Sequence, residues 1–264
     1  MFTKYDDFIF DIWGVIHNGH HLLPGVLELI TKLQEKKKGV YFLSNAPRPA
    51  AHVHQKLVEL GLNIPVSSVL TSGEFFLHYL ANNKDDLGFK VYVIGLEKND
   101  VLLAQAGVEI VDNVLDADYF LMLAFADGED ELKYYTELMN PALKNKLKFI
   151  CVNPDKVVVH GNDLRYCQGY FAQVYEEMGG EVLYYGKPHR PIYEHLFAAH
   201  RIQKQRALIF GDSLETDIKG AGEFGVDSVF LLTGIHKGET DVANLLKMHT
   251  TIPTYIYNGL TDLL

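Results

Sequence analysis

The sequence contains little cysteine and no long apolar run. Only two of its 264 residues are cysteine, so neither a disulfide framework nor a zinc site can be built from cysteine alone, and a reducing compartment is indicated. No apolar run approaches the roughly 20 residues of a membrane-spanning helix. Asp6 and Asp7 stand where the apolar core of a signal peptide would begin. We therefore expect a soluble, cytoplasmic protein with no membrane partner.

Positive charge is also scarce. The chain has 24 Lys and Arg against 34 Asp and Glu, which gives a net charge of −10 with neutral histidine. Sequence-independent binding to nucleic acid needs clustered basic residues, so we expect no nucleic-acid partner. An anionic ligand would have to find local positive charge, because the overall field repels it. What is abundant is apolar content, at 48% with 15 Phe and 15 Tyr, which excludes wholesale disorder.

Short apolar runs alternate with helical patterns along most of the chain. Residues 8–10 and 39–43 read as buried strands, and apolar residues recur at helical spacing over 25–38 between them. The pattern predicts further strands at 91–95, 119–124, 148–152, 207–210 and 227–232, and further helices at 51–60, 99–106, 132–140, 171–178, 192–200 and 217–224. This alternation is typical of an α/β fold, a parallel sheet with crossover helices. The length suits one large domain or two modest ones.

Three of the predicted strands end in a polar residue, namely Asp11, Ser44 and Asp212. Ligands of open parallel sheets bind just beyond the carboxyl ends of the strands. An acid at a strand end can also be no more than a cap for the next helix. Three such residues, together with a Gly-Lys-Pro segment around Lys187, favour one shared site.

These segments resemble the four motifs of the haloacid dehalogenase (HAD) superfamily, in the same order. The first motif is matched by Asp-Ile-Trp-Gly-Val from Asp11, and the second by Phe-Leu-Ser-Asn, which contains Ser44. Gly-Lys-Pro around Lys187 matches the third. The fourth is matched by Gly-Asp-Ser-Leu-Glu-Thr-Asp-Ile, which contains Asp212 and Asp217. The resemblance covers most of the chain and implies a Rossmann-like core with a parallel sheet.

The spacing of the motifs resembles one branch of the superfamily. Only 33 positions separate Asp11 from Ser44, whereas 143 separate Ser44 from Lys187. This is similar to the C2-capped, class IIA branch, which includes sugar-phosphate, nucleotide and phosphoglycolate phosphatases. It implies an α/β C2 cap domain at 77–182, inserted between core parts at 1–76 and 183–264. It also implies a homodimer formed through the cap. Asn-Pro-Asp at 153–155 resembles a cap segment of that branch.

The resemblance assigns a role in phosphoryl transfer to each motif residue. Asp11 would be the nucleophile and form an aspartyl-phosphate. Ser44, Asn45 and Lys187 would bind the oxygens of the phosphoryl group. Lys187 would also offset the charge of the clustered carboxylates, which makes it catalytic together with Asp11. The expected activity is that of a HAD-type phosphohydrolase, a phosphatase, which acts on a small phosphorylated metabolite such as a sugar phosphate or a nucleotide-like compound.

The same resemblance implies a Mg²⁺ ion. Its ligands would be the carboxylates of Asp11 and Asp212 and the backbone carbonyl of Trp13, since Mg²⁺ prefers oxygen ligands in octahedral geometry. Asp217 would be a further ligand, or would hold a metal-bound water or orient Lys187. Three carboxylates gathered without a cation would strongly raise one another's pKa.

Trp13 departs from the phosphatase pattern. Phosphatases of the superfamily have a second aspartate at this position, which protonates the leaving oxygen and then activates water, and an indole cannot exchange a proton near neutral pH. Three interpretations stay open: another group such as His17, His189 or water carries the proton; the substrate has a good leaving group (an acyl phosphate, aryl phosphate or anhydride); or the protein binds a phosphorylated metabolite in a non-catalytic or regulatory role. A dehalogenase ranks last, because the short segment between Asp11 and Ser44 has no room for its cap.

Specificity is expected in the cap. Residues 126–130 and 165–169 are candidates to face the core site, and ordinary exposed loops are an equally good interpretation of both.

Overall fold

The chain folds into two compact units, each of which combines a parallel sheet with helices. The computed structural model describes residues 2–95, 101–160 and 163–264. The first unit comprises Met1–Ser44, Ala50–Leu70 and Lys187–Leu264, and the second comprises Asn45–Pro49 and Thr71–Gly186. The predicted α/β fold class is confirmed. The expected domain limits stay a prediction, because a cluster of contacts does not show that a segment folds independently.

The sheet of the first unit has six strands in the order β13-β12-β11-β1-β2-β3. Their bounds are β1 (Asp7–Phe10), β2 (Gly39–Ser44), β3 (Val69–Thr71), β11 (Ala207–Gly211), β12 (Asp227–Leu231) and β13 (Tyr255–Tyr257). β1 pairs in parallel with both β2 and β11. From β1 the chain proceeds to β2 and β3 on one side, and from β11 to β12 and β13 on the other. The order therefore reverses between β1 and β11, where open α/β sheets bind their ligands.

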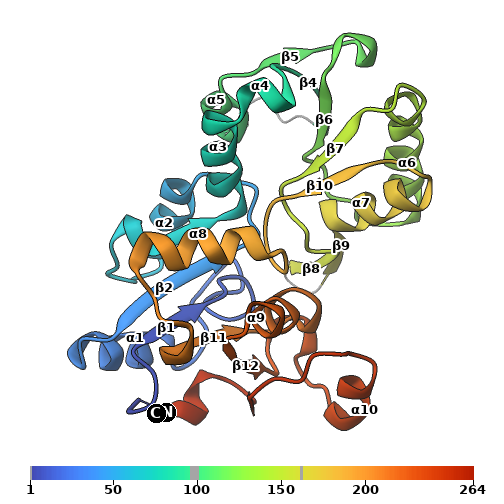
Figure 1. The fold of residues 1–264 in the computed structure, drawn as a ribbon. Coiled ribbons are helices and arrows are strands. Elements are labelled where there is room, and N and C mark those ends of the chain that lie inside the picture. Colours follow the sequence, from blue (N-terminus) through green and yellow to red (C-terminus); the bar gives the residue numbers. More distant parts are fainter. Residues whose placement is uncertain (1, 96–100, 161–162) are drawn as a thin grey trace. The chain divides into compact units, whose positions relative to one another are not determined.

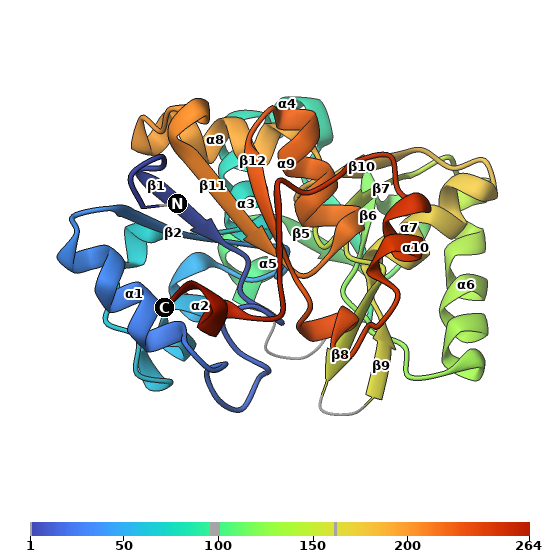
Figure 2. The same cartoon turned by 90° about the horizontal axis from the view of Figure 1, so that it is seen from below.

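The central strands of this sheet are apolar without alternation because both of their faces are covered. Phe8, Ile9 and Phe10 of β1 are fully buried, as expected for parallel strands between two layers of helices. Helix α1 (Val26–Glu35) covers one face, and α8 (Arg190–His200) and α9 (Lys219–Phe224) lie on the other (Figure 2). The unit also contains α2 (Ala50–Glu59) and α10 (Val242–Lys247).

The second unit contains a five-stranded sheet in the order β10-β7-β6-β4-β5. Its strands are β4 (Lys90–Ile94), β5 (Glu109–Val111), β6 (Tyr119–Met122), β7 (Lys148–Cys151) and β10 (Val182–Tyr184). Helices α3 (Ser72–Asn82) and α5 (Val101–Ala106) flank one face of this sheet, and α6 (Glu129–Lys144) and α7 (Gln168–Glu177) flank the other (Figure 1). The unit also contains the short helix α4 (Lys84–Leu87) and two strands paired antiparallel, β8 (Val157–His160) and β9 (Asp163–Tyr166).

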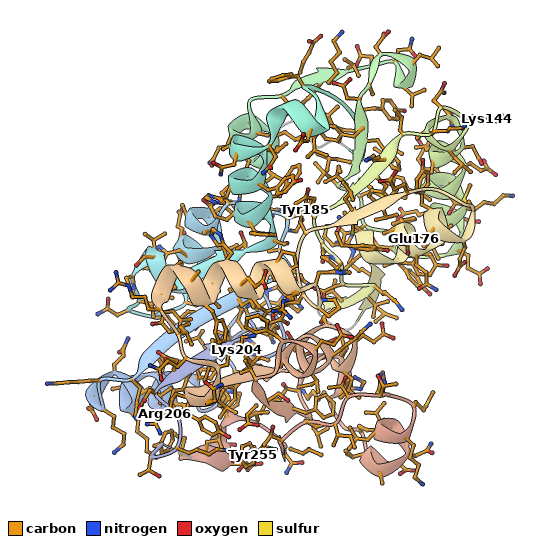
Figure 3. All side chains as sticks on the ribbon, viewed as in Figure 1. Lys144, Glu176, Tyr185, Lys204, Arg206 and Tyr255 are labelled. Carbon is orange, nitrogen blue, oxygen red and sulfur yellow. The ribbon has the colours of Figure 1, made fainter. Side chains whose placement is uncertain are left out.

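Aromatic packing joins α3 to the sheet of the second unit. Tyr185, which directly follows β10 and is labelled in Figure 3, packs against Phe76 and Tyr79 of α3 with ring centroids 5.1 and 5.0 Å apart. This helix starts with a capping interaction, since the hydroxyl of Thr71 accepts the N–H of Glu74 at 3.0 Å.

Residues 99–100 of the predicted helix 99–106 lie outside the described residues. Within the described part of the chain, no helix is long and apolar enough to cross a membrane.

Candidate active site

Three carboxylates converge at the carboxyl ends of β1 and β11. Asp11 follows β1 directly, Asp212 follows β11, and Asp217 lies in a one-turn helix, η4 (Leu214–Ile218). One oxygen of each lies within 4.8 Å of the others, and all three residues are buried. The N–H of Asp11 donates to the carbonyl of Phe210 at 2.8 Å, which extends the β1–β11 pairing to Asp11. The parallel register thus brings distant segments of sequence to one point.

Lys187 supplies the positive charge of this cluster. Its side chain is only 2% exposed, and its ammonium donates to Asp11 Oδ1 at 2.5 Å and to Asp217 Oδ1 at 2.7 Å. It also donates to the carbonyl of Leu43 at 3.1 Å. An ammonium has three N–H donors, so a single side chain can bond to both carboxylates and to the backbone of β2. Lys187 is thereby fixed between the ends of β1 and β2, the strand that carries Ser44.

A wide helical turn places Asp217. The N–H groups of Asp217 and Ile218 both donate to the carbonyl of Ser213 at 3.1 Å, which is the pattern of a π-type turn, common at functional sites. The second carboxylate oxygen of Asp217 accepts the N–H of Ser213 at 3.2 Å. The predicted helix 217–224 therefore begins earlier, as η4, and continues as α9. This turn directs the Asp217 carboxylate toward Lys187.

Asp212 lies against the backbones of two glycines. A Cβ atom at Gly14 would come within 2.3 Å of Asp212 Oδ2, and one at Gly234 within 1.7 Å. Both glycines have positive φ, at 83° and 49°. The same oxygen accepts the N–H of Ile235 at 3.0 Å. Sequence reasoning did not single out these glycines, although a glycine just beyond a strand end is a usable signal for a close approach.

The donor set of this cluster fits a divalent cation. If all three carboxylates were ionised, one ammonium would leave two negative charges uncompensated in a buried space. Burial, followed by the charges of Asp11 and Asp217, raises the pKa of Asp212 well above its usual range. A hard cation such as Mg²⁺, which prefers carboxylate oxygen, would offset both effects. The structure thus brings together the carboxylates predicted to be metal ligands, while the role of the Trp13 carbonyl stays a prediction.

Ser44 and Asn45 differ in their surroundings. Ser44 ends β2 and is 6% exposed, next to Leu43, whose carbonyl binds Lys187. Asn45 belongs to the second unit, and its side-chain N–H donates to Asp155 Oδ1 at 2.8 Å. The phosphate-binding roles expected for both residues stay predictions, and the Asn45 amide already has a partner that the sequence did not indicate.

Trp13 is a half-buried residue within the loop after β1. Its ring packs edge-on against the ring of His17 with centroids 5.2 Å apart. A Cβ atom at Gly19 would come within 2.9 Å of Trp13 Cη2, so the indole lies over that glycine. The N–H of Gly14 donates to the carbonyl of His17 at 2.9 Å. Trp13 is therefore held by a compact turn formed by its own loop.

His17 is poorly suited to act as a general acid. It is 5% exposed, and its Nδ1 accepts the N–H of Gly19 at 2.9 Å, which requires that nitrogen to be unprotonated. Burial, aided by the charge of Lys56, lowers the pKa of His17 to about 4. At neutral pH this imidazole is neutral and already hydrogen-bonded. His189, the other candidate, directly precedes α8.

The two loops proposed to carry specificity contact each other in the second unit. Arg165 of β9 forms an ion pair with Asp127, with Nη2 to Oδ2 at 2.8 Å. The backbones of Ala126 and Tyr166 exchange two hydrogen bonds at 3.0 and 2.8 Å. The segments 126–130 and 165–169 therefore form one structural element of this unit.

Comparison with known proteins places the chain among relatives of one kind. Residues 8–109 match a family model described as haloacid dehalogenase-like hydrolase, and residues 184–263 match one described as HAD-hydrolase-like. A crystal structure of a hydrolase of the haloacid dehalogenase-like family from Brucella suis 1330 is 30% identical, with a TM-score of 0.81. The match covers 98% of this chain and 97% of that one.

Two further relatives have names that specify an activity. The p-nitrophenyl phosphatase from Archaeoglobus fulgidus is 25% identical, with a TM-score of 0.78 and 98% coverage of both chains. An acid sugar phosphatase from Staphylococcus haemolyticus (strain JCSC1435) is 25% identical over 261 residues, which is 97% of this chain and 94% of that protein.

Proposed function

Because the chain belongs to the haloacid dehalogenase-like hydrolase family, in its class IIA branch, we propose that it is a Mg²⁺-dependent phosphohydrolase of a small phosphorylated metabolite. The enzyme class, a phosphatase of this superfamily, follows from the relatives described above. The metal dependence, the aspartyl-phosphate at Asp11 and the choice of substrate are the parts that we propose. The single observation that carries them is the buried cluster in which Lys187 bonds to both Asp11 and Asp217.

The proposed reaction has two displacements at phosphorus. In the first, a carboxylate oxygen of Asp11 attacks the phosphorus and the bond to the leaving oxygen breaks, which forms an aspartyl-phosphate. In the second, water attacks the same phosphorus and restores the Asp11 carboxylate with release of phosphate. Lys187 and Ser44 would hold the phosphoryl oxygens through both displacements. Such positioning and charge stabilisation provide most of the catalysis in phosphoryl transfer.

Asp11, Asp212 and the carbonyl of Trp13 would hold Mg²⁺, with Asp217 nearby. When bound, the ion would neutralise the charge of the phosphoryl oxygens. The ammonium of Lys187 bonds to the Oδ1 atoms of both Asp11 and Asp217. Its positive charge therefore reduces the repulsion between the two carboxylates. This arrangement would offset part of the negative charge that the two carboxylates place beside an anionic substrate.

The leaving group should need little help from an acid. General acid catalysis by a positioned side chain typically contributes about 10²–10⁴-fold, and Trp13 cannot provide it. His17 is neutral and engaged with Gly19. We therefore propose that aryl phosphates, acyl phosphates or anhydrides are turned over better than alkyl esters. The name of the Archaeoglobus relative, a p-nitrophenyl phosphatase, supports an aryl phosphate as the first substrate to test.

The proposed function is tested by release of phosphate from p-nitrophenyl phosphate in the presence of Mg²⁺. The Asp11→Asn variant should lose turnover by about 10³-fold or more, because an amide is no nucleophile. Asn and Asp have nearly the same shape, so the fold is expected to survive, which a thermal melt would verify. Equal inactivity of the wild type and this variant across a broad panel of phosphate esters would refute the enzymatic function.

A second candidate function is favoured by Trp13 itself. A protein that binds a phosphorylated metabolite without turnover would not need the missing acid. It predicts thermal stabilisation by the ligand and no release of phosphate. Trp13→Asp separates the two: if only the acid is missing, hydrolysis of alkyl phosphates should rise by about 10²–10⁴-fold while that of aryl phosphates changes little. No gain for either class would favour the binding function.

The remaining expectations are proposals as well. The sugar phosphatase among the relatives supports a sugar phosphate over a nucleotide-like substrate. A homodimer through the inserted unit and a cytoplasmic location stay predictions, and light scattering on the purified chain tests the first of them.

A further inference from the structure

The segment that follows Ser44 is held by the second unit. The chain passes from the first unit to the second between Ser44 and Asn45. Asn45 is 2% exposed, and its Nδ2 donates to Asp155 Oδ1 at 2.8 Å. The start of α3 binds the same segment, because the N–H of Gly73 donates to the carbonyl of Ala46 at 3.1 Å. Asn45 is thus a structural part of the second unit.

Asp155 is itself fixed in place. It ends a turn, residues 153–155, in which its N–H donates to Asn153 Oδ1 at 3.1 Å. Its carbonyl accepts the N–H of Gly169, in the first turn of α7, at 3.1 Å. A Cβ atom at Gly169 would come within 2.1 Å of the carbonyl oxygen of Pro154. The backbone of this turn therefore packs tightly on α7, which fixes the backbone that carries the Asp155 carboxylate.

Asn45 also touches the residue that precedes Lys187. A Cβ atom at Gly186 would come within 2.6 Å of Asn45 Oδ1 and 2.7 Å of Pro154 Cδ. Gly186 has a φ of +143°, in the region that favours glycine. The Asn45 amide is thus enclosed by Asp155 on one side and Gly186 on the other. Through these two neighbours it connects the peptide after Ser44 with the peptide before Lys187.

We propose that Asp155 is a positioning residue for phosphate binding, which acts through Asn45. This inference rests on the proposed function, since it assumes that Ser44 and Lys187 bind the phosphoryl group. Asp155 fixes the Asn45 amide, and the amide fixes the backbone next to both phosphate-binding side chains. A displacement of about 1 Å in a phosphate-binding side chain can lower the rate by about 10²-fold. Asp155 can therefore affect phosphate binding although it does not itself bind the phosphoryl group.

The experiment compares Asp155→Ala, Asp155→Asn, Asn45→Ala and the double variant of both alanine changes. It measures KM for p-nitrophenyl phosphate and the inhibition constant of inorganic phosphate. We expect Asp155→Ala to raise both by about tenfold, because a hydrogen bond to a charged acceptor is lost. Asp155→Asn should restore part of the loss, since an amide oxygen can accept the same bond. In the Asn45→Ala background, Asp155→Ala should add little further change.

A matched control is Asp118→Asn. Asp118 also lies in the second unit and accepts the N–H groups of Phe89 and Lys90 at 2.8 and 2.9 Å, next to the start of β4. The Asp118→Asn variant should have an altered melting temperature but an unchanged KM for p-nitrophenyl phosphate and an unchanged inhibition constant of inorganic phosphate. If Asp155→Ala behaves like this control, or if its effect is as large in the Asn45→Ala background as in the wild type, the inference is wrong.

Calorimetric titration with inorganic phosphate separates this inference from the proposed function, because it needs no turnover. A wild type without hydrolysis that still binds phosphate would refute the proposed activity, and the affinity of Asp155→Ala for phosphate would still decide the inference. A weaker affinity, restored in part by Asp155→Asn, supports it. An unchanged affinity overturns it.

Discussion

Gly234 constrains the site although it has no side chain. Alanine at this position would place its Cβ 1.7 Å from Asp212 Oδ2, so the carboxylate would have to move. We expect Gly234→Ala to raise the Mg²⁺ concentration for half-maximal activity by about tenfold, the equivalent of 1.4 kcal/mol. Activity measured over a Mg²⁺ series gives this value.

Gly238→Ala is the control for that change. Gly238 has a φ of 84°, and no atom lies within 4 Å of the position of its Cβ. It shares the backbone strain of a left-handed residue, about 1–2 kcal/mol, but not the clash. Equal Mg²⁺ requirements in the two variants would contradict the role given to Gly234.

The residues that contribute a side chain to the site were predictable from the sequence, whereas the backbone groups of the site were not. Asp11, Ser44 and Asp212 each follow an apolar run, and parallel pairing places such ends at one edge of the sheet. The carbonyl of Leu43 and the N–H of Ile235 were not predictable, because backbone groups have no sequence signal. Nor was the bond from Asn45 to Asp155, which depends on how residues 110 positions apart fold together.

Strand β1 is anchored at its amino end by an ion-pair network. Asp6 accepts Lys38 Nζ at 2.9 Å and Arg206 Nε at 2.7 Å, and these residues directly precede β2 and β11 (Arg206 is labelled in Figure 3). The hydrogen bond from Arg206, followed by that from Lys38, lowers the pKa of Asp6 to about 2. The network therefore ties together the starts of three adjacent strands.

The stability that Asp6 contributes should depend on pH. Its pKa is lower in the folded state than in the unfolded chain, so the contribution is present above about pH 4, the ordinary value of an aspartate, and is lost as the pH falls toward 2. We expect Asp6→Asn to lower the urea midpoint at pH 7, with a difference from wild type that shrinks between pH 4 and pH 2. The exposed Asp116→Asn serves for comparison. A difference that persists at pH 2 would contradict the assignment.

Helices were predictable where apolar residues recur at regular helical spacing. They were less predictable where a capping residue or a proline influences where the helix begins or ends. The helix predicted over 25–38 forms as α1, with Leu29, Ile30 and Leu33 buried. The helix predicted over 132–140 extends as α6 to Lys144, past Pro141, because the buried Ala142 packs in the core. Sequence reasoning missed α3, whose Thr-Ser-Gly-Glu start is a capping-box pattern.

At the scale of the whole molecule, the net charge of −10 includes the buried carboxylate cluster. Repulsion within this cluster destabilises the fold when no cation is bound. Because Mg²⁺ would bind the folded state alone, it should raise the melting temperature. At a Mg²⁺ concentration one hundred times its dissociation constant, the free energy of unfolding should rise by about 2.7 kcal/mol. A thermal melt with and without Mg²⁺ measures this gain.

Asp212→Asn should abolish the response to Mg²⁺ without lowering the melting temperature of the metal-free protein. Burial already raises the pKa of Asp212, so a neutral amide of the same shape removes repulsion in the folded state. A metal-free variant that melts far below the wild type would show that the carboxylate stabilises the fold by other contacts.

The parallel pairing of β1 with β11 has a consequence for the order in which the protein is made. Phe8 pairs with Leu208, so the first strand to leave the ribosome waits for a partner synthesised about 200 residues later, roughly 10–40 s at ordinary rates of translation. Most of the second unit leaves the ribosome in that interval. The nascent chain therefore exposes one of its most apolar strands for much of its synthesis, a period in which chaperones would protect it from aggregation.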